Sequence, residues 1–177
     1  MEVTTKEVIK KTREYLDYVE RHYDNVQKAW EDVQEKCADI WPLSVDSMRF
    51  MIDSQIKTHD ISKLSQEEFV PYRLVFYPTL AENTGPDDMK EAWEHHKRCN
   101  RHHWQTWARD YPVGELWGID CIHMLVDWMA MAYEFGGSAR SFYENNCHRI
   151  ELPVDAIALM NVIFDRVYGV VEVGVEF

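Results

Sequence analysis

The stretch SQIKTHDISKLSQEEF, residues 54–69, places a His-Asp pair where one predicted helix ends and another begins. His59 and Asp60 follow the apolar positions of a helix predicted over 44–59 with Ser44 as its cap. Lys63 lies about one helical turn beyond Asp60. SQEE at 65–68 has the pattern of a capping box and predicts a new helix start. The junction therefore carries an imidazole, a carboxylate and an ammonium group close together.

Apolar periodicity predicts helices along most of the chain outside this junction. The longest covers 4–36, where Thr4 or Thr5 can cap the first turn and His22 lies on the apolar stripe, three residues after Val19. The tail VEVGVEF, 171–177, alternates with period two, which is the pattern of a short strand. The sequence predicts an all-α, single-domain, mostly antiparallel helical bundle over 1–177. Its remaining helices are expected at 65–78, 86–107, 115–135, 138–147 and 153–168.

Composition narrows the classes of function. Hydrophobic residues make up 46% of the 177 residues, so one domain with a sizeable core is expected. The net charge of −12 argues against a general nucleic-acid-binding surface, although KRCNR at 97–101 is a basic island. No apolar run approaches the roughly 18 residues of a membrane span, and the charged N-terminus predicts no secretory leader. The four cysteines form no CxxC pair, so a reduced, cytoplasmic protein with free thiols is expected.

Four of the eight histidines fall within HHKRCNRHH, 95–103. Histidine together with carboxylate is the ligand set of Mn, Fe, Co, Ni and Zn sites. On a continuous helix, His96 and His103 share one face and are predicted to point inward. If the helix breaks near Asn100, His102 is the alternative, and on a continuous helix His95 lies with His102 on the other face.

Asp127 lies within the apolar segment MLVDWMAMA. An isolated ionised carboxylate would be costly to bury there, so a metal ion or a cationic partner is expected beside it. Asp120, one heptad earlier, is the competing carboxylate.

The order His22, His59-Asp60, Asp127 resembles the HD-domain superfamily of metal-dependent phosphohydrolases, whose helical core carries these four ligands. The gaps, 37 residues from His22 to His59 and 67 from Asp60 to Asp127, are similar to those of its small 5′-nucleotidase members. HDISK resembles the HDxxK form of the motif, in which the lysine faces the phosphate. The Gly-Tyr-Pro signature of the cyclic-dinucleotide phosphodiesterases is absent.

The segments HDISKLSQEEF, AWEHHKRCNRHHW and MLVDWMAMA look closest to a small bacterial and phage family within that superfamily. The resemblance covers a core of about residues 15–145 and leaves the C-terminal helix, 153–168, outside it. The additional histidines resemble those of dinuclear members, in which two more histidines hold a second metal. The implied cofactor is one or two divalent transition-metal ions: Mn, Co, Ni, Zn or Fe.

The resemblance implies a phosphohydrolase acting on a small phosphorylated molecule, with a nucleotide as the expected class. The implied metal ligands are His22, His59, Asp60 and Asp127 for one ion, and His96 and His103 for a second ion that Asp60 bridges to the first. Lys63 is expected to neutralise phosphoryl charge, and Glu68 to orient a ligating histidine. Arg101 and Arg140 are the further candidates for binding substrate.

Two other functions fit the same residues. Some HD-domain proteins with four histidines and two aspartates use iron and oxygen, so a di-iron oxygenase is the first alternative. The second is a non-catalytic interaction protein stabilised by its metal. Metal identity, an oxygen requirement and access to a pocket would separate the three.

Overall fold

The computed structural model describes residues 3–82, 86–110 and 116–170, and every element in these ranges is a helix. The all-α prediction is confirmed for this part of the chain, whereas the strand predicted in 171–177 lies outside it. None of the described helices combines the length and the apolar character needed to cross a membrane. In chain order the elements are α1 (Thr5–Cys37), α2 (Asp46–Lys57), η1 (Ile61–Leu64), α3 (Gln66–Phe76), α4 (Pro86–Cys99), α5 (Trp104–Trp107), η2 (Ala108–Asp110), α6 (Trp117–Phe135), α7 (Ala139–Asn146), η3 (Cys147–Arg149) and α8 (Val154–Tyr168).

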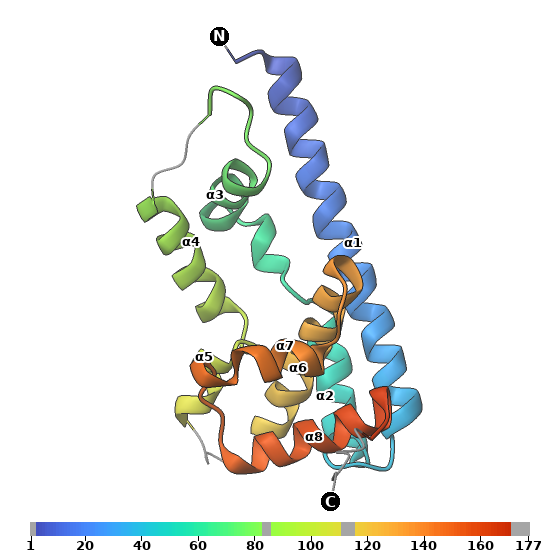
Figure 1. The fold of residues 1–177 in the computed structure, drawn as a ribbon. Coiled ribbons are helices and arrows are strands. Elements are labelled where there is room, and N and C mark those ends of the chain that lie inside the picture. The colour runs from blue at the N-terminus through green and yellow to red at the C-terminus, as the bar shows by residue number, and fades with distance from the viewer. Residues whose placement is uncertain (1–2, 83–85, 111–115, 171–177) are drawn as a thin grey trace, which may run out of the picture.

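Helix α1 is the longest helix among the described residues and runs along one side of the molecule (Figure 1). Its main packing partner is α6, and it also contacts α2, α3 and α8. The α3 and α4 helices pack on each other beside the N-terminal half of α1. The axes of α7 and α8 run at a steep angle to that of α1, so the arrangement is less regular than the predicted antiparallel bundle (Figure 1).

The apolar core is divided into two clusters of unequal size. The larger one joins the C-terminal half of α1 to α2, α6 and α8, and it includes Val26, Trp30 and Leu125. The smaller one joins Tyr15 of α1 to Tyr72 of α3 and to α4. The buried polar side chains described below come from these helices and from the turns that follow α2 and α4.

Most predicted helix boundaries differ from the observed ones by only a few residues, but the continuous helix predicted over 86–107 is wrong and the alternative of a break near Asn100 is observed. Helix α4 ends at Cys99, and a turn separates it from α5. The buried Asn100 explains the break, because its Nδ2 donates to the carbonyl oxygen of His96 at 2.8 Å and to Oγ of Ser62 at 2.7 Å. The side-chain amide thus satisfies the helix end and ties it to η1.

Helix α3 begins directly after Ser65, as predicted, but the Ser65 side chain makes no capping hydrogen bond. The predicted cap Ser44 is wrong, because α2 begins at Asp46 with Val45 in the N-cap position. At α1 the capping prediction is confirmed, because Thr4 and Glu7 form a complete capping box. The carboxylate of Glu68, expected in the box of α3, points instead to two histidines.

Gly118, in the first turn of α6, provides a test of this packing. A Cβ atom at this position would lie 2.5 Å from Cη2 of Trp41. Helix propensity alone favours alanine by up to about 1 kcal/mol, but overpacking of this kind typically costs about 1–3 kcal/mol. We expect Gly118→Ala to lower the thermal unfolding midpoint, and Gly118→Ala combined with Trp41→Leu to recover part of the loss. A raised midpoint in the single variant would contradict this packing.

Candidate metal centre

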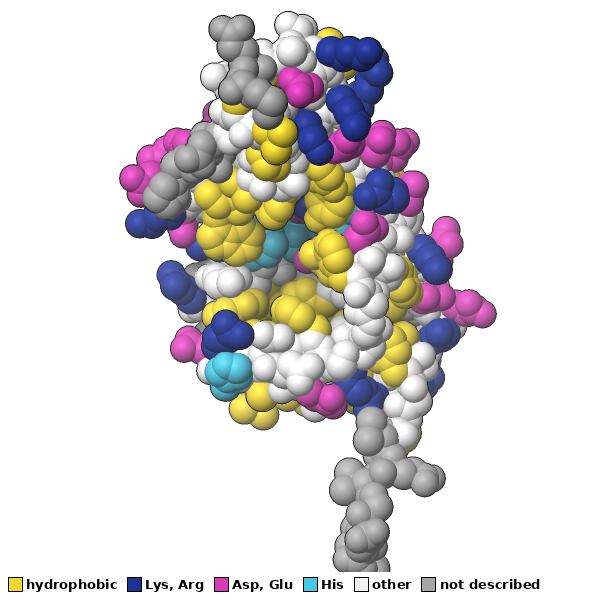
Figure 2. Space-filling view, turned by 45° about the horizontal axis from the view of Figure 1, so that its top comes forward, with side chains coloured by type: hydrophobic (Ala, Val, Ile, Leu, Met, Phe, Trp, Pro, Cys, Tyr) yellow, Lys and Arg dark blue, Asp and Glu magenta, His cyan; other side chains and the backbone are white. Residues whose placement is uncertain are grey.

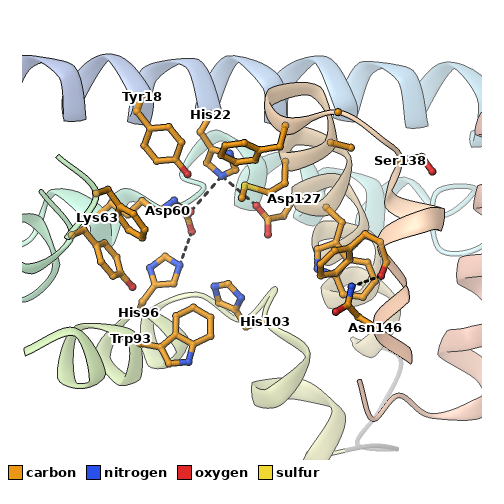
Figure 3. A pocket seen from close by; sticks show the side chains of 18 of the residues that line it. Tyr18, His22, Asp60, Lys63, Trp93, His96, His103, Asp127, Ser138 and Asn146 are labelled. Carbon is orange, nitrogen blue, oxygen red and sulfur yellow. Dashed lines mark hydrogen bonds and ion pairs between the residues drawn. The ribbon is translucent and has the colours of Figure 1, made fainter. Parts of the chain in front are cut away.

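The first group of converging side chains comes from α1, α6 and the turn after α2. The Nε2 atoms of His22 and His59 lie 3.0 Å apart, and Oδ2 of Asp60 lies 3.6 and 3.3 Å from them. Asp127 lies on the other side of His22 (Figure 3), with its Oδ1 3.2 Å from His22 and 3.5 Å from His59. Ligands about 2.1 Å from a shared metal ion stand about 3.0–3.4 Å apart. His22, His59 and Asp60 therefore have the spacing of a metal coordination sphere, and Asp127 adds a carboxylate beside the two histidines.

The backbone at Asp60 explains how two consecutive residues reach the same point. Helix α2 ends at Lys57, and Asp60 adopts a left-handed conformation with φ 54° and ψ 22°. Aspartate tolerates this conformation better than most residues. The turn lets His59 and Asp60 both face the group and starts η1, which carries Lys63.

The second group shares Asp60 with the first. Its other oxygen, Oδ1, lies 3.4 Å from Nε2 of His96 and 3.5 Å from Nε2 of His102. His103 completes the group, in which the potential ligand atoms lie within 4.8 Å of one another. The break after α4 brings all three histidines to one point, so His102 joins His96 and His103 and replaces neither of them.

Unpaired buried atoms show that these residues fit a metal ion. Oδ1 of Asp60, Nε2 of His103 and both ring nitrogens of His102 are buried without a hydrogen-bond partner in the described part of the chain. Buried polar atoms are rarely left unpaired. His96 donates a hydrogen bond from Nδ1 to Glu68 at 2.7 Å. The lone pair on its Nε2 therefore faces the carboxylate oxygen Oδ1 of Asp60, and both atoms are acceptors. A cation between them resolves this arrangement.

The protonation states favour the same interpretation. Burial lowers the pKa of His102 far below its usual value, that of His103 to about 4 and that of His123 to about 3. These rings are therefore neutral at pH 7 and keep a free lone pair. Burial alone would raise the pKa of Asp60 and Asp127, but the neighbouring imidazoles, together with Lys63 for Asp60, lower it well below its usual range. Anionic carboxylates and neutral imidazoles are the forms that bind metals.

His22 and His59 respond to the same carboxylates. Burial lowers their pKa, but Asp60 and Asp127 outweigh this effect and raise the pKa of His22, and that of His59 to about 9. Without a metal ion, protons on these two rings would balance the carboxylate charges. A divalent ion would supply that positive charge and displace the protons.

Glu68 holds two of the neighbouring histidines. It is fully buried, and its two oxygens accept hydrogen bonds from Nδ1 of His95 and Nδ1 of His96, each at 2.7 Å. The second of these bonds fixes the tautomer of His96 with its Nε2 toward Asp60, which is the role expected of a residue that orients a metal ligand. His95 stays outside both groups.

A chain of side chains orients His59 in the same way. Nδ1 of His59 lies 2.8 Å from Nε2 of His123, whose Nδ1 lies 3.2 Å from Oε1 of Gln55. With each Nδ1 as donor, Nε2 of His59 keeps its lone pair for the first group. The sequence interpretation missed His123. Its spacing of four residues from Asp127 on one helix face was the available signal.

Both groups open into one pocket of about 640 Å³. Figure 2 shows histidine side chains at the bottom of a hollow rimmed by hydrophobic side chains. Lys63 stands beside the groups in the pocket wall, with Nζ 2.8 Å from Oδ2 of Asp60 (Figure 3). Burial lowers the pKa of Lys63, but the charge of Asp60 outweighs it and raises the pKa above its usual value, so the ammonium form persists at neutral pH.

Two predicted substrate-binding residues lie elsewhere. Arg101 pairs with Asp120 at 3.0 Å, and Arg140 bonds Asp165 and the carbonyl oxygen of Gly169. Neither arginine lines the pocket. The ion pair with Arg101 also explains Asp120, the competing carboxylate, which belongs to neither group.

Comparison with known proteins adds one finding. The model of a family of unknown function, DUF5662, matches residues 11–163, which include every residue of the two groups. The chain belongs to the DUF5662 family. No curated protein and no solved structure matches this DUF5662 chain.

Asp60 touches both groups, so its charge should control metal binding. Asparagine keeps the shape and tolerates the left-handed backbone, so Asp60→Asn removes mainly the charge. We expect this variant to lose most of its metal, measured by elemental analysis of protein purified without chelators. Asp120→Asn is the matched control, because it neutralises a buried carboxylate outside the groups. Full metal content in Asp60→Asn would refute the centre.

The second group can be tested separately. Replacing His96 and His103 with alanine leaves His22, His59 and Asp127 in place, so metal content should fall from about two ions per chain to about one. Native mass spectrometry measures this stoichiometry. His95→Ala should change nothing, although His95 also bonds Glu68. An unchanged stoichiometry in the double variant would show that the second group holds no ion.

Proposed function

We propose that this protein is a metal-dependent phosphohydrolase of the HD-domain type that acts on a small phosphorylated molecule, with nucleotides as the expected class. The observation that carries the proposal is the position of Lys63. A partly buried ammonium group stands 2.8 Å from Asp60, which both candidate metal groups share. A fixed cation beside a metal centre suits a substrate that brings several negative oxygens to one point.

His22, His59, Asp60 and Asp127 would hold one ion, and Asp60, His96, His102 and His103 a second. Divalent Mn, Co, Ni, Zn or Fe suits such nitrogen and oxygen ligands. Bound there, the metal would supply Lewis-acid polarisation of the phosphoryl group and a more acidic water.

The chain's own residues have distinct roles in this proposal. Lys63 donates hydrogen bonds to the phosphoryl oxygens and offsets the charge that develops on them. Glu68 and His123 hold the rings of His96 and His59 in the ligating tautomer. The largely apolar lining of the pocket lowers the local polarity, which strengthens each of these electrostatic contacts.

The pocket helps to distinguish the phosphohydrolase from the two alternative functions. A non-catalytic protein stabilised by metal needs no cavity beside its ions, whereas both groups here line a pocket. The ligand set of histidines and aspartates also suits iron, so the di-iron oxygenase is the second candidate. Iron in the purified protein and oxygen consumption, without hydrolysis of any phosphorylated compound, would favour it.

Lys63→Met tests the role of the ammonium group. Methionine keeps much of the stem and removes the charge. We expect metal content to be unchanged and turnover to fall by roughly 10²-fold, the scale of removing one preorganised electrostatic donor. The substrate is first identified by screening nucleoside mono- and triphosphates and cyclic nucleotides with Mn²⁺ or Co²⁺.

Lys10→Met serves as the matched control, because Lys10 is exposed on the N-terminal part of α1. Its turnover should equal that of the unmodified protein. Normal turnover in Lys63→Met would remove the phosphate role of this lysine.

A further inference from the structure

The pocket extends well past the metal groups. Its volume of about 640 Å³ lies in the range of about 300–1,000 Å³ that is typical of pockets for organic ligands. Beyond Asp127 its wall is formed by Trp128 and Met131 of α6, and by Phe142 of α7. Figure 3 shows Ser138 and Asn146 on the far side of Asp127 from Lys63. A phosphate at the metal end leaves this second part for the rest of the substrate.

Charge is confined to one end of the pocket. Among the described residues that line it, the charged side chains are Asp60, Lys63 and Asp127, which stand together with the histidines. Lys63 is the one Lys or Arg in this lining. At the far end the polar side chains among the lining residues, such as Ser141 and Asn145, are all uncharged. The pocket thus offers one ammonium group for phosphate and no charged partner for a distant ionic group.

The rim is apolar and unusually exposed. Three phenylalanines from different helices line the pocket and face solvent, with exposed fractions of 54% for Phe76, 70% for Phe135 and 45% for Phe142. Figure 2 shows hydrophobic side chains on both sides of the hollow. Exposed apolar surface gathered in one place is a feature of interaction sites, ligand-binding grooves among them.

We propose that the substrate is a phosphate monoester of an uncharged organic group, either an alkyl or aryl alcohol or a nucleoside whose base supplies the flat apolar surface, and not a polyphosphate. The proposal rests on the proposed function and specifies its substrate. The phosphate lies at the metal groups and Lys63, and the organic group lies between Met131 and the phenylalanine rim. A second and third phosphate would place charge against apolar walls, where it has no partner.

Binding of inert analogues tests the apolar part independently of catalysis. Methyl-, butyl- and octylphosphonate are titrated into Mn²⁺-loaded protein, and Trp fluorescence is read because Trp93 and Trp128 line the pocket. Affinity should rise at least about tenfold from butyl to octyl, since each buried methylene contributes favourably. In Met131→Asn the octyl-to-methyl affinity ratio should fall by about tenfold. Met51→Asn is the control, because Met51 is exposed on α2 outside the pocket. Equal affinity for all three phosphonates would overturn the proposal.

Hydrolysis of methyl phosphate, octyl phosphate, 2-naphthyl phosphate, AMP and ATP completes the test. The kcat/KM for octyl phosphate, 2-naphthyl phosphate or AMP should exceed that for both methyl phosphate and ATP by about tenfold or more. If AMP has the highest kcat/KM, the organic group is a nucleoside. If an alkyl or aryl ester has the highest kcat/KM, the organic group is that of a simple alcohol. A preference for ATP would overturn the proposal. No hydrolysis at all, with chain-length-dependent binding intact, would refute the phosphohydrolase and leave the ligand class supported.

Discussion

Buried acceptor atoms that face one another are the constraint on which the rest of the structure depends. The lone pairs of the imidazoles and carboxylates converge between two apolar clusters, where water cannot solvate them freely. Left alone, such an arrangement would be strongly destabilising, so it requires a cation or protons. The fold brings the groups together from elements far apart in sequence: α1, the turn after α2, α4, the turn before α5, and α6.

Local backbone chemistry aims these side chains. The left-handed turn at Asp60 lets two neighbouring residues share one centre, and the Asn100 amide ends α4 so that the following histidines turn inward. Glu68 and His123 then fix the ring orientation of His96 and His59, each through a hydrogen bond to the Nδ1 atom of the ring. The centre is thus held by hydrogen bonds to carbonyl, carboxylate and imidazole acceptors, and packing alone does not specify it.

Much of this arrangement could be predicted from sequence, for identifiable reasons. His22 stood on an apolar stripe and Asp127 in an apolar helix, and burial follows from periodicity in both cases. The break at Asn100 could be raised only as an alternative, because no Gly or Pro marks it and its cause is a tertiary hydrogen bond to Ser62. The inward turn of His102 depended on that break. His123 was hidden because a histidine among apolar residues resembles core filling until its partner Gln55, 68 residues away, is known.

The division of the core has a consequence for motion. Helix α4 packs mainly on α3, and the small cluster around Tyr15 and Tyr72 is the apolar anchor of this pair to α1. The same pair carries Glu68 and His96, so this wall of the pocket also carries part of the candidate metal centre. Regions with few buried apolar contacts open at the lowest free energy. An ion shared between Asp60 and His96 would therefore hold α3 and α4 against the rest of the molecule, and its loss would loosen this wall of the pocket.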